Sequence, residues 1–229
     1  VPELPSTRAG RRTTPRTREL SLALLRERDG AERCAARGAG GDVAARNGRS
    51  DLLAQEAAEC SNVLIEDCEV DGASGTAIYV GQGTGAIVRR NKAHDGVLGI
   101  ELENTTSGEV YGNEVYNNSF GIAVFLLGNL TKKSAAKNLV HDNQVHDNNH
   151  QNFGDPKTFV GGVPQGTGIF VVGGDETEIC ANTIENNESS GIAVVSYLLL
   201  EAHTGATPDP MTDPYPHRVF IHGDTFTNN

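Results

Sequence analysis

A short glycine-led phrase recurs through residues 61 to 229 and constrains the fold more than any other feature of the sequence. It reads AIYV at residue 77, GIEL at 99, GIAV at 121, GIFV at 168 and GIAV at 191, with steps of 22, 22, 47 and 23 residues. Repeats of this length are typical of architectures in which each unit buries its apolar face only by stacking on its neighbours. The phrase therefore predicts a coil of parallel β-strands, with each copy in the same place on successive turns.

A second recurring unit lies between these phrases and has a polar residue at its centre. The central residue is an asparagine or an aspartate in all six copies, namely Asp67, Asn91, Asn113, Asn143, Asn182 and Asp224. At a bend of the coil each amide can reach the turns above and below, which lie about 4.8 Å away at the usual strand spacing. We therefore interpret Asn91, Asn113, Asn143 and Asn182 as a structural ladder that satisfies buried turn amides.

Alternation along the strands assigns the core, because successive side chains of a β-strand point to opposite faces. In the glycine-led strands the inward positions are Ile78, Ile100, Ile122, Ile169 and Ile192, together with Val80, Leu102, Val124, Val171 and Val194. In the second unit they are Leu64, Val88, Val110, Val140, Ile179 and Ile221. The sequence thus predicts an all-β fold with one apolar core along residues 61 to 229.

Residues 1 to 60 follow different compositional rules and contain no copy of either unit. They carry eleven arginines against nine acidic residues, a net charge of +2, whereas residues 61 to 229 carry eight basic against twenty-one acidic residues, a net charge of −13. One helix is expected at residues 17 to 37, between stretches whose composition predicts disorder. A flexible linker, a basic tail for an anionic partner, and a segment read out of frame from a GC-rich gene are the three interpretations. We place the domain boundary at residue 61.

The overall charge and the absence of familiar signals exclude several classes of protein. A net charge of −11 argues against a nucleic-acid partner, because phosphate binding needs concentrated Lys and Arg. No apolar run is long enough to span a membrane, and no signal-peptide pattern is found at the start of the chain. The four cysteines show no C-x-x-C spacing and no zinc pattern, and their pairing stays open.

Several stretches of the repeat region resemble a known family. RRNKAHDGVLGIELENTTSGEVYGNEVYNNSFGIAVF, GVPQGTGIFVV, GIAVVSYLL and DPYP are similar to bacterial envelope proteins described as parallel β-helix repeat-containing proteins. That family is part of the superfamily that includes pectate lyases and polyuronate lyases and epimerases. The resemblance covers residues 61 to 229 and implies a right-handed parallel β-helix and a periplasmic or secreted location. The family's coil continues upstream, where residues 1 to 60 show no such repeat.

Two outward columns of the predicted coil carry histidine and tyrosine at neighbouring positions. His94, Tyr116 and His146 are expected to stack on adjacent turns, and Tyr111 is expected beside His141. Aromatic rings can pack on sugar rings, and imidazole can act as a base or a metal ligand. We therefore predict a module that binds a polysaccharide or another envelope component through these five residues and nearby loops, with an ordinary solvated face as the alternative.

Three insertions interrupt the period and provide those loops. Residues 126 to 137 and 198 to 217 leave the coil at one corner, and residues 149 to 167 leave it at the opposite corner. Long insertions with their own prolines are frequently functional in repeat proteins. The two loops at the same corner are expected to flank one turn and to form the wall of a cleft.

The resemblance also implies an enzymatic alternative, a polysaccharide lyase or uronate epimerase that acts on acidic glycans with Ca²⁺. Such chemistry needs a cation that neutralises the uronate carboxylate and a base that removes the neighbouring proton. Glu101 and Glu103 point outward on one strand and are the candidate Ca²⁺ ligands, while Arg89 and Lys133 are the candidate catalytic bases. No other cofactor is indicated, because phosphate-binding, zinc-protease and nucleophile-elbow motifs are not found in the sequence.

Overall fold

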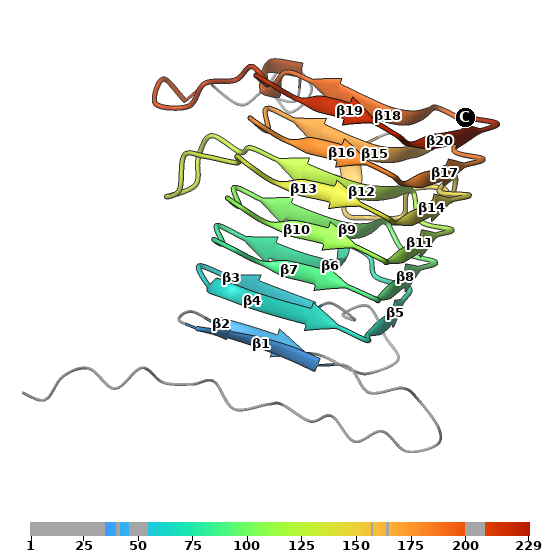
Figure 1. The fold of residues 1–229 in the computed structure, drawn as a ribbon, viewed down its shortest axis with the longest axis horizontal. Helices are drawn as coiled ribbons and strands as arrows, with labels where there is room; N and C mark the ends of the chain where they lie inside the picture. The colour runs from blue at the N-terminus through green and yellow to red at the C-terminus, as the bar shows by residue number, and fades with distance from the viewer. Residues whose placement is uncertain (1–34, 40–41, 46–54, 157, 164, 200–208) are drawn as a thin grey trace, which may run out of the picture.

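The computed structural model describes residues 35–39, 42–45, 55–156, 158–163, 165–199 and 209–229. Within these residues the regular structure is almost entirely β-strand, arranged in three sheets that enclose a common core (Figure 1). The colour in Figure 1 changes steadily from blue to red along the stack, so the chain climbs it turn by turn.

Each sheet collects one strand from successive turns. The first sheet has seven strands in the order β1 (Ala35–Ala39), β4 (Ser61–Glu66), β7 (Ile87–Arg89), β10 (Glu109–Tyr111), β13 (Leu139–His141), β16 (Glu178–Cys180) and β19 (Phe220–His222). The second has six in the order β20 (Thr225–Thr227), β17 (Thr183–Glu185), β14 (Gln144–His146), β11 (Glu114–Tyr116), β8 (Lys92–His94) and β5 (Glu69–Asp71). The third has seven in the order β18 (Ser190–Val195), β15 (Thr167–Val172), β12 (Phe120–Phe125), β9 (Leu98–Glu103), β6 (Thr76–Gly81), β3 (Gln55–Ala58) and β2 (Asp42–Ala45).

The predicted coil of parallel strands is confirmed, and its register explains the glycine-led phrase. Ile122 of β12 pairs in parallel with Ile100 of β9 and with Ile169 of β15, so the copies of the phrase lie directly on one another. The leading glycine is needed because a Cβ at Gly121 would overlap the backbone carbonyl oxygen of Gly168 on the next turn. Among the described strands, only the pairs β1–β4 and β2–β3 are antiparallel.

The core consists of the side chains that alternation placed inside. Ile100, Ile122 and Ile169 are fully buried, as are most of the other predicted inward residues. Val194 and Ile221 were also expected inside, but they are 38% and 42% exposed. They belong to the last described turn, and no further described turn covers them.

The first copy of the second unit is shifted by one residue from the predicted alignment. Ile65 is fully buried and takes the inward position that the sequence analysis gave to Leu64. Cys68 likewise takes the ladder position in place of Asp67, and its backbone N–H donates to Asn91 Oδ1 at 3.0 Å. Asp67 adopts the left-handed conformation, with a φ of 56°, immediately before that position. The aspartate matched the pattern by residue type, whereas the hydrogen bonds follow the backbone turn.

The predicted asparagine ladder is confirmed. Asn91 donates to Asn113 Oδ1 from its backbone N–H at 3.0 Å and from Nδ2 at 2.9 Å. The same two bonds continue through the rest of the ladder, from Asn113 to Asn143, Asn182 and Asp224. A second ladder, which the sequence analysis missed, runs along the other end of the second sheet through Asn118, Asn148, Asn187 and Asn229. Both ladders satisfy buried turn amides and fix the stacking of the turns.

The N-terminal part of the chain is only partly described. Strands β1, β2 and β3 precede residue 61, so sheet structure is present on the N-terminal side of the predicted boundary. The helix expected at residues 17 to 37 lies mostly outside the described residues, and residues 35 to 37 belong to β1. The expected disorder of the segment and the boundary at residue 61 stay predictions. No helix within the described residues is long and apolar enough to cross a membrane.

Candidate functional site

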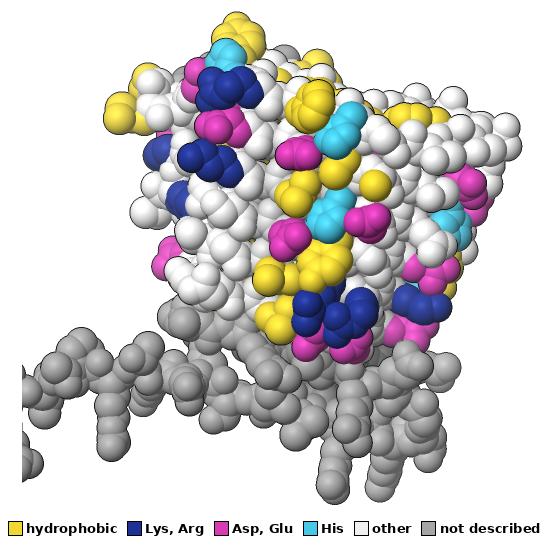
Figure 2. Space-filling model, viewed as in Figure 1, with side chains coloured by type: hydrophobic (Ala, Val, Ile, Leu, Met, Phe, Trp, Pro, Cys, Tyr) yellow, Lys and Arg dark blue, Asp and Glu magenta, His cyan; other side chains and the backbone are white. Residues whose placement is uncertain are grey.

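The predicted histidine and tyrosine columns are stacked in the structure. In the second sheet the ring of Tyr116 lies 4.7 Å from that of His94 and 5.2 Å from that of His146, with interplanar angles of 12° and 3°. In the first sheet the rings of Tyr111 and His141 are 4.9 Å apart at 12°. Figure 2 shows a stripe along the stack of turns in which histidine, acidic and hydrophobic side chains alternate, with basic side chains at its lower end.

This stacking occupies the ring faces that a sugar would need. Tyr116 has His94 against one face and His146 against the other, so its faces are covered. The imidazoles are also held by carboxylates, as His141 illustrates: its Nδ1 lies 2.6 Å from Asp142 Oδ2 and its Nε2 lies 3.0 Å from Glu109 Oε1. The columns therefore offer ring edges and carboxylates to a ligand rather than open aromatic faces.

The two candidate catalytic bases are engaged elsewhere. Arg89 of β7 donates from Nε and Nη2 to Glu66 Oε2 at 3.0 and 2.8 Å, and hydrogen bonds from Arg89 are the largest cause that lowers the pKa of the Glu66 carboxyl. Lys133 donates from Nζ to Asp209 Oδ2 and to the Gly128 carbonyl oxygen, both at 2.5 Å. Neither residue lines the cavity beside Glu101, so the structure does not assemble the predicted catalytic set there.

The two loops that leave the coil at one corner contact each other through an ion pair. The Lys133–Asp209 ion pair joins the first loop to the other, of which residues 200 to 208 lie outside the described part. The loops and the turn between them enclose a small cavity of about 110 Å³, whose lining includes Gly173, Asp175 and His217. This cavity is too small for more than a few atoms of a ligand, so we interpret it as part of the contact between the loops rather than as a binding site.

A larger cavity lies over the third sheet, beneath the insertion at the opposite corner. It has a volume of about 240 Å³ and is lined by Thr76, Tyr79, Glu101, Glu103, Thr158, Phe159 and Val160. The first two residues come from β6, the two glutamates from β9, and the last three from the insertion, which contains the 3₁₀ turn η1 (Val160–Gly162). Thr158 is exposed, so the cavity reaches the surface at this rim.

The sequence of β9 and its neighbours places the two glutamates outward. Ile100 and Leu102 are fully buried, and alternation therefore directs Glu101 and Glu103 to the outer face of the sheet. Gly81 leaves room for the Tyr79 ring, because a Cβ at residue 81 would overlap that ring.

The insertion is held over the sheet by packing and by hydrogen bonds. Phe159 packs edge-to-face against the buried Phe125, with ring centres 4.8 Å apart at 89°. Asn152 Nδ2 donates to the carbonyl oxygens of Val160 and Val163, both at 2.8 Å. These contacts hold Phe159 and Val160 as an apolar wall opposite the glutamates.

The glutamate pair has unusual electrostatics. Glu101 is only 3% exposed and accepts a hydrogen bond of 2.5 Å from the Thr76 hydroxyl. Burial, followed by repulsion from Glu103, raises the pKa of the Glu101 carboxyl to about 8. Burial also raises the pKa of Glu103, against a 2.5 Å hydrogen bond from the Tyr79 hydroxyl. No ion pair joins either carboxyl to a basic side chain within the described residues, which do not include Lys157.

The two glutamates were predicted from the sequence, but the residues around them were not. Tyr79 could have been found by aligning AIYV with GIEL, because Tyr79 then falls opposite Glu101, with which it pairs in register. Nothing in the sequence indicated that the insertion lies over this face of the sheet. The cavity supplies two carboxyls and three hydroxyls, but the Thr76 and Tyr79 hydroxyls donate to the carboxyls, so these oxygens do not form the shell of roughly six to eight ligands that Ca²⁺ takes. Ca²⁺ binding by Glu101 and Glu103 therefore stays a prediction.

Comparison with known proteins agrees with this architecture. A family model described as the right-handed β-helix region matches residues 54–198, which is more than half of the chain. The chain belongs to this family. Among solved structures, this β-helix is similar to an alginate lyase from Paenibacillus sp. str. FPU-7, at 15% sequence identity and a TM-score of 0.43, over 70% of this chain and 57% of the lyase chain. The β-helix thus spans little more than half the length of that lyase. A search of curated proteins found no match to this chain.

Proposed function

We propose that this β-helix binds a hydroxyl-rich glycan, with one sugar unit in the cavity beside Glu101 and Glu103. The observation that carries the proposal is the buried carboxyl pair, which has no basic partner among the described residues and lines a cavity that reaches the surface. Burying a carboxyl without a charged partner opposes folding. Such groups with shifted pKa values in a cavity are typical of functional sites.

The lining of the cavity suits a sugar. The carboxyl and hydroxyl groups of Glu101, Glu103 and Tyr79 can exchange hydrogen bonds with sugar hydroxyls, while Phe159 and Val160 offer apolar surface to the C–H face of the ring. The volume of about 240 Å³ is below the roughly 300 to 1,000 Å³ of sites for drug-sized ligands, so a single ring is the fitting unit. The neighbouring outer faces of the stacked strands provide an extended surface for the rest of a glycan chain.

General acid–base catalysis is the second candidate, and the pKa of Glu101 favours it. With a pKa of about 8, Glu101 holds its proton at neutral pH and can donate it, while Glu103 beside it can accept one. A lyase or epimerase acting on an acidic glycan would use such a pair only with a cation that offsets the repulsion between the uronate and the carboxylate that accepts the proton. The glycan-binding proposal needs no such cation and is therefore preferred.

The first test is a glycan array that contains neutral and uronate oligosaccharides, with and without Ca²⁺. The affinity of the strongest ligand is then measured for the wild type and for the variants Glu101→Gln, Phe159→Ala and Tyr116→Ala. We expect the first two variants to weaken binding by about tenfold or more, equal to about 1.4 kcal/mol, while Tyr116→Ala retains it.

Two results would overturn the proposal. One is the absence of any ligand for the folded protein, and the other is unchanged affinity in both cavity variants. A loss of binding in Tyr116→Ala alone would place the glycan site on the column of His94, Tyr116 and His146 instead of in the cavity. Formation of an unsaturated sugar, detected by ultraviolet absorbance with a uronate substrate, would favour the enzymatic candidate. A periplasmic or secreted location completes the proposal, since it would bring the protein to envelope and extracellular glycans.

A further inference from the structure

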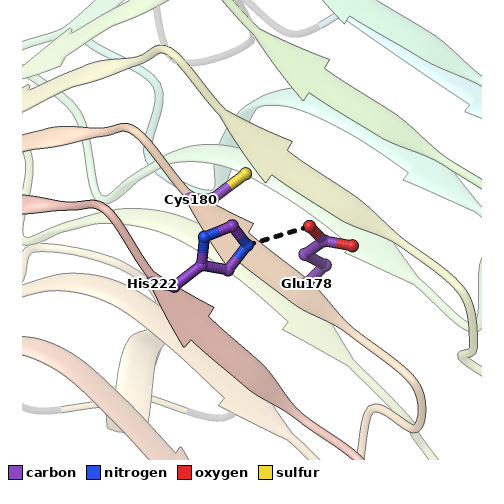
Figure 3. A group of neighbouring side chains, drawn as sticks. All are labelled: Glu178, Cys180 and His222. Carbon is purple, nitrogen blue, oxygen red and sulfur yellow. Dashed lines mark hydrogen bonds and ion pairs between the residues drawn. The ribbon is translucent and has the colours of Figure 1, made fainter.

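Three side chains with metal-binding chemistry meet on the outer face of the first sheet (Figure 3). Glu178 and Cys180 lie two residues apart on β16 and so point to the same side of the sheet. His222 lies on the adjacent strand β19, where it pairs in register with Cys180. The carboxylate oxygen, the thiol sulfur and the imidazole nitrogen all lie within 4.8 Å of one another. Residues 42 positions apart in the chain thus form one cluster.

The three groups are available for coordination. Cys180 is not part of a disulfide and is half-buried, while Glu178 and His222 are exposed. In Figure 3 the His222 ring points toward Glu178, and its Nε2 lies 3.0 Å from Glu178 Oε1. In a tetrahedral zinc site the ligand atoms are about 3.3 to 3.7 Å apart, given bonds of roughly 2.0 to 2.3 Å. Small rotations of exposed side chains are enough to close this cluster around an ion.

The surroundings of the cluster favour a cation. The carboxylates of Glu178, Asp224 and Asp142 act electrostatically on the Cys180 side chain. The second carboxylate oxygen of Asp224, Oδ2, is buried and has no hydrogen-bond partner among the described residues. A positive ion near the sulfur would offset this negative charge.

The same sheet contains an internal comparison for this cluster. Glu109 of β10 and His141 of β13 repeat the carboxylate–imidazole contact, with Glu109 Oε1 and His141 Nε2 also 3.0 Å apart. The position that corresponds to Cys180 is occupied there by Tyr111, whose ring stacks on His141. The thiol is therefore the group that distinguishes the two clusters.

We propose that Glu178, Cys180 and His222 form a binding site for one thiophilic divalent cation, of which Zn²⁺ is the best match. Thiolate, imidazole and carboxylate are the ligand types that zinc accepts, and three protein ligands leave a fourth position for water or another molecule. As the metal–sulfur bond forms, the thiol proton is released to solvent. The site lies on a different sheet from the cavity beside Glu101, so it stands independently of the proposed function.

The test uses the metal ions alone, added to the full chain under reducing conditions. Zn²⁺ is titrated by calorimetry, and Co²⁺ is followed by absorbance, because a thiolate ligand gives a sulfur-to-cobalt charge-transfer band that carboxylate and imidazole ligands do not give. We expect one ion per chain with the charge-transfer band. The variants Cys180→Ser and His222→Ala should each reduce the affinity for Zn²⁺ about tenfold or more, and Cys180→Ser should also abolish the band.

The variant His94→Ala is the matched control, since it removes an imidazole that contacts a carboxylate, that of Glu69, on the second sheet and away from the thiol. It should leave the Zn²⁺ affinity and the Co²⁺ spectrum unchanged. Circular dichroism confirms that each variant is folded before it is compared. The inference would be overturned if the wild type bound no Zn²⁺ or Co²⁺, or if the charge-transfer band persisted in Cys180→Ser.

Discussion

The substitution Asn143→Ala tests whether the asparagine ladder holds the turns together. The Asn143 side chain makes four hydrogen bonds within the ladder. Nδ2 donates to the Val110 carbonyl oxygen and to Asn182 Oδ1, both at 2.9 Å, while Oδ1 accepts from the backbone N–H of Asn113 at 3.0 Å and from its Nδ2 at 2.9 Å. Each such bond contributes about 1 kcal/mol net, and the buried N–H of Asn113 would be left without an acceptor. We therefore expect a loss of about 4 kcal/mol in the free energy of unfolding.

The assay is urea denaturation followed by circular dichroism, with Gln144→Ala as the matched control. Gln144 is the next residue in the chain, but its side chain is exposed, so its truncation should change the free energy of unfolding by no more than about 0.5 kcal/mol. The reasoning is refuted if Asn143→Ala unfolds within about 1 kcal/mol of the control, because four buried hydrogen bonds cannot be lost at so small an effect.

Three further predictions concern the cavity, the glycine column and the turns. The pKa of Glu101 is raised from 4.5 to about 8, so between pH 4.5 and pH 8 the folded protein holds a proton that the unfolded chain has lost. The free energy of unfolding should therefore fall by up to about 5 kcal/mol as the pH rises across this range. Glu101→Gln should flatten that decline in denaturation curves measured across the window, and an unchanged slope would contradict the raised pKa. Gly121→Ala should lower the free energy of unfolding by about 1 to 3 kcal/mol, because the new Cβ would overlap the next turn. Gly75→Ala is the control, since Gly75 lies at an open position, and equal melting temperatures of the two variants would refute the overlap. Ala181→Gly should stabilise the protein by up to about 1 kcal/mol, because Ala181 has a φ of 56°, and a lower melting temperature would contradict that account.

The fold was predictable from the sequence because its repeat is read directly from the chain. The glycine-led phrase and the central asparagines recur at steps near 22 residues wherever no insertion intervenes, and alternation then assigns the core, as the buried Ile100 and Ile122 illustrate. The exception was the first copy of the second unit, where Cys68 occupies the ladder position although Asp67 matches the pattern better by type. A backbone N–H can donate to the next asparagine whatever side chain it carries, so residue type alone does not fix the register there.

The candidate sites were less predictable because they depend on contacts between turns and insertions. The stacking of His94 and Tyr116 followed from the register, but the sequence did not show that the stack covers the ring faces. The cavity beside Glu101 needs Phe159, which comes from an insertion whose path over the sheet no repeat encodes. Cys180 and His222 come together because their strands pair in register, and Glu178 completes the cluster through its position two residues before Cys180 on the same strand.

The central claim is that the cavity between the third sheet and the insertion is the glycan site. The most direct measurement is a crystal structure of the protein with the strongest oligosaccharide from the array. The account predicts a sugar ring between Phe159 and Glu101, with its hydroxyls hydrogen-bonded to Glu101, Glu103 or Tyr79. An oligosaccharide bound along Tyr116 or Tyr111, with the cavity empty, would contradict it.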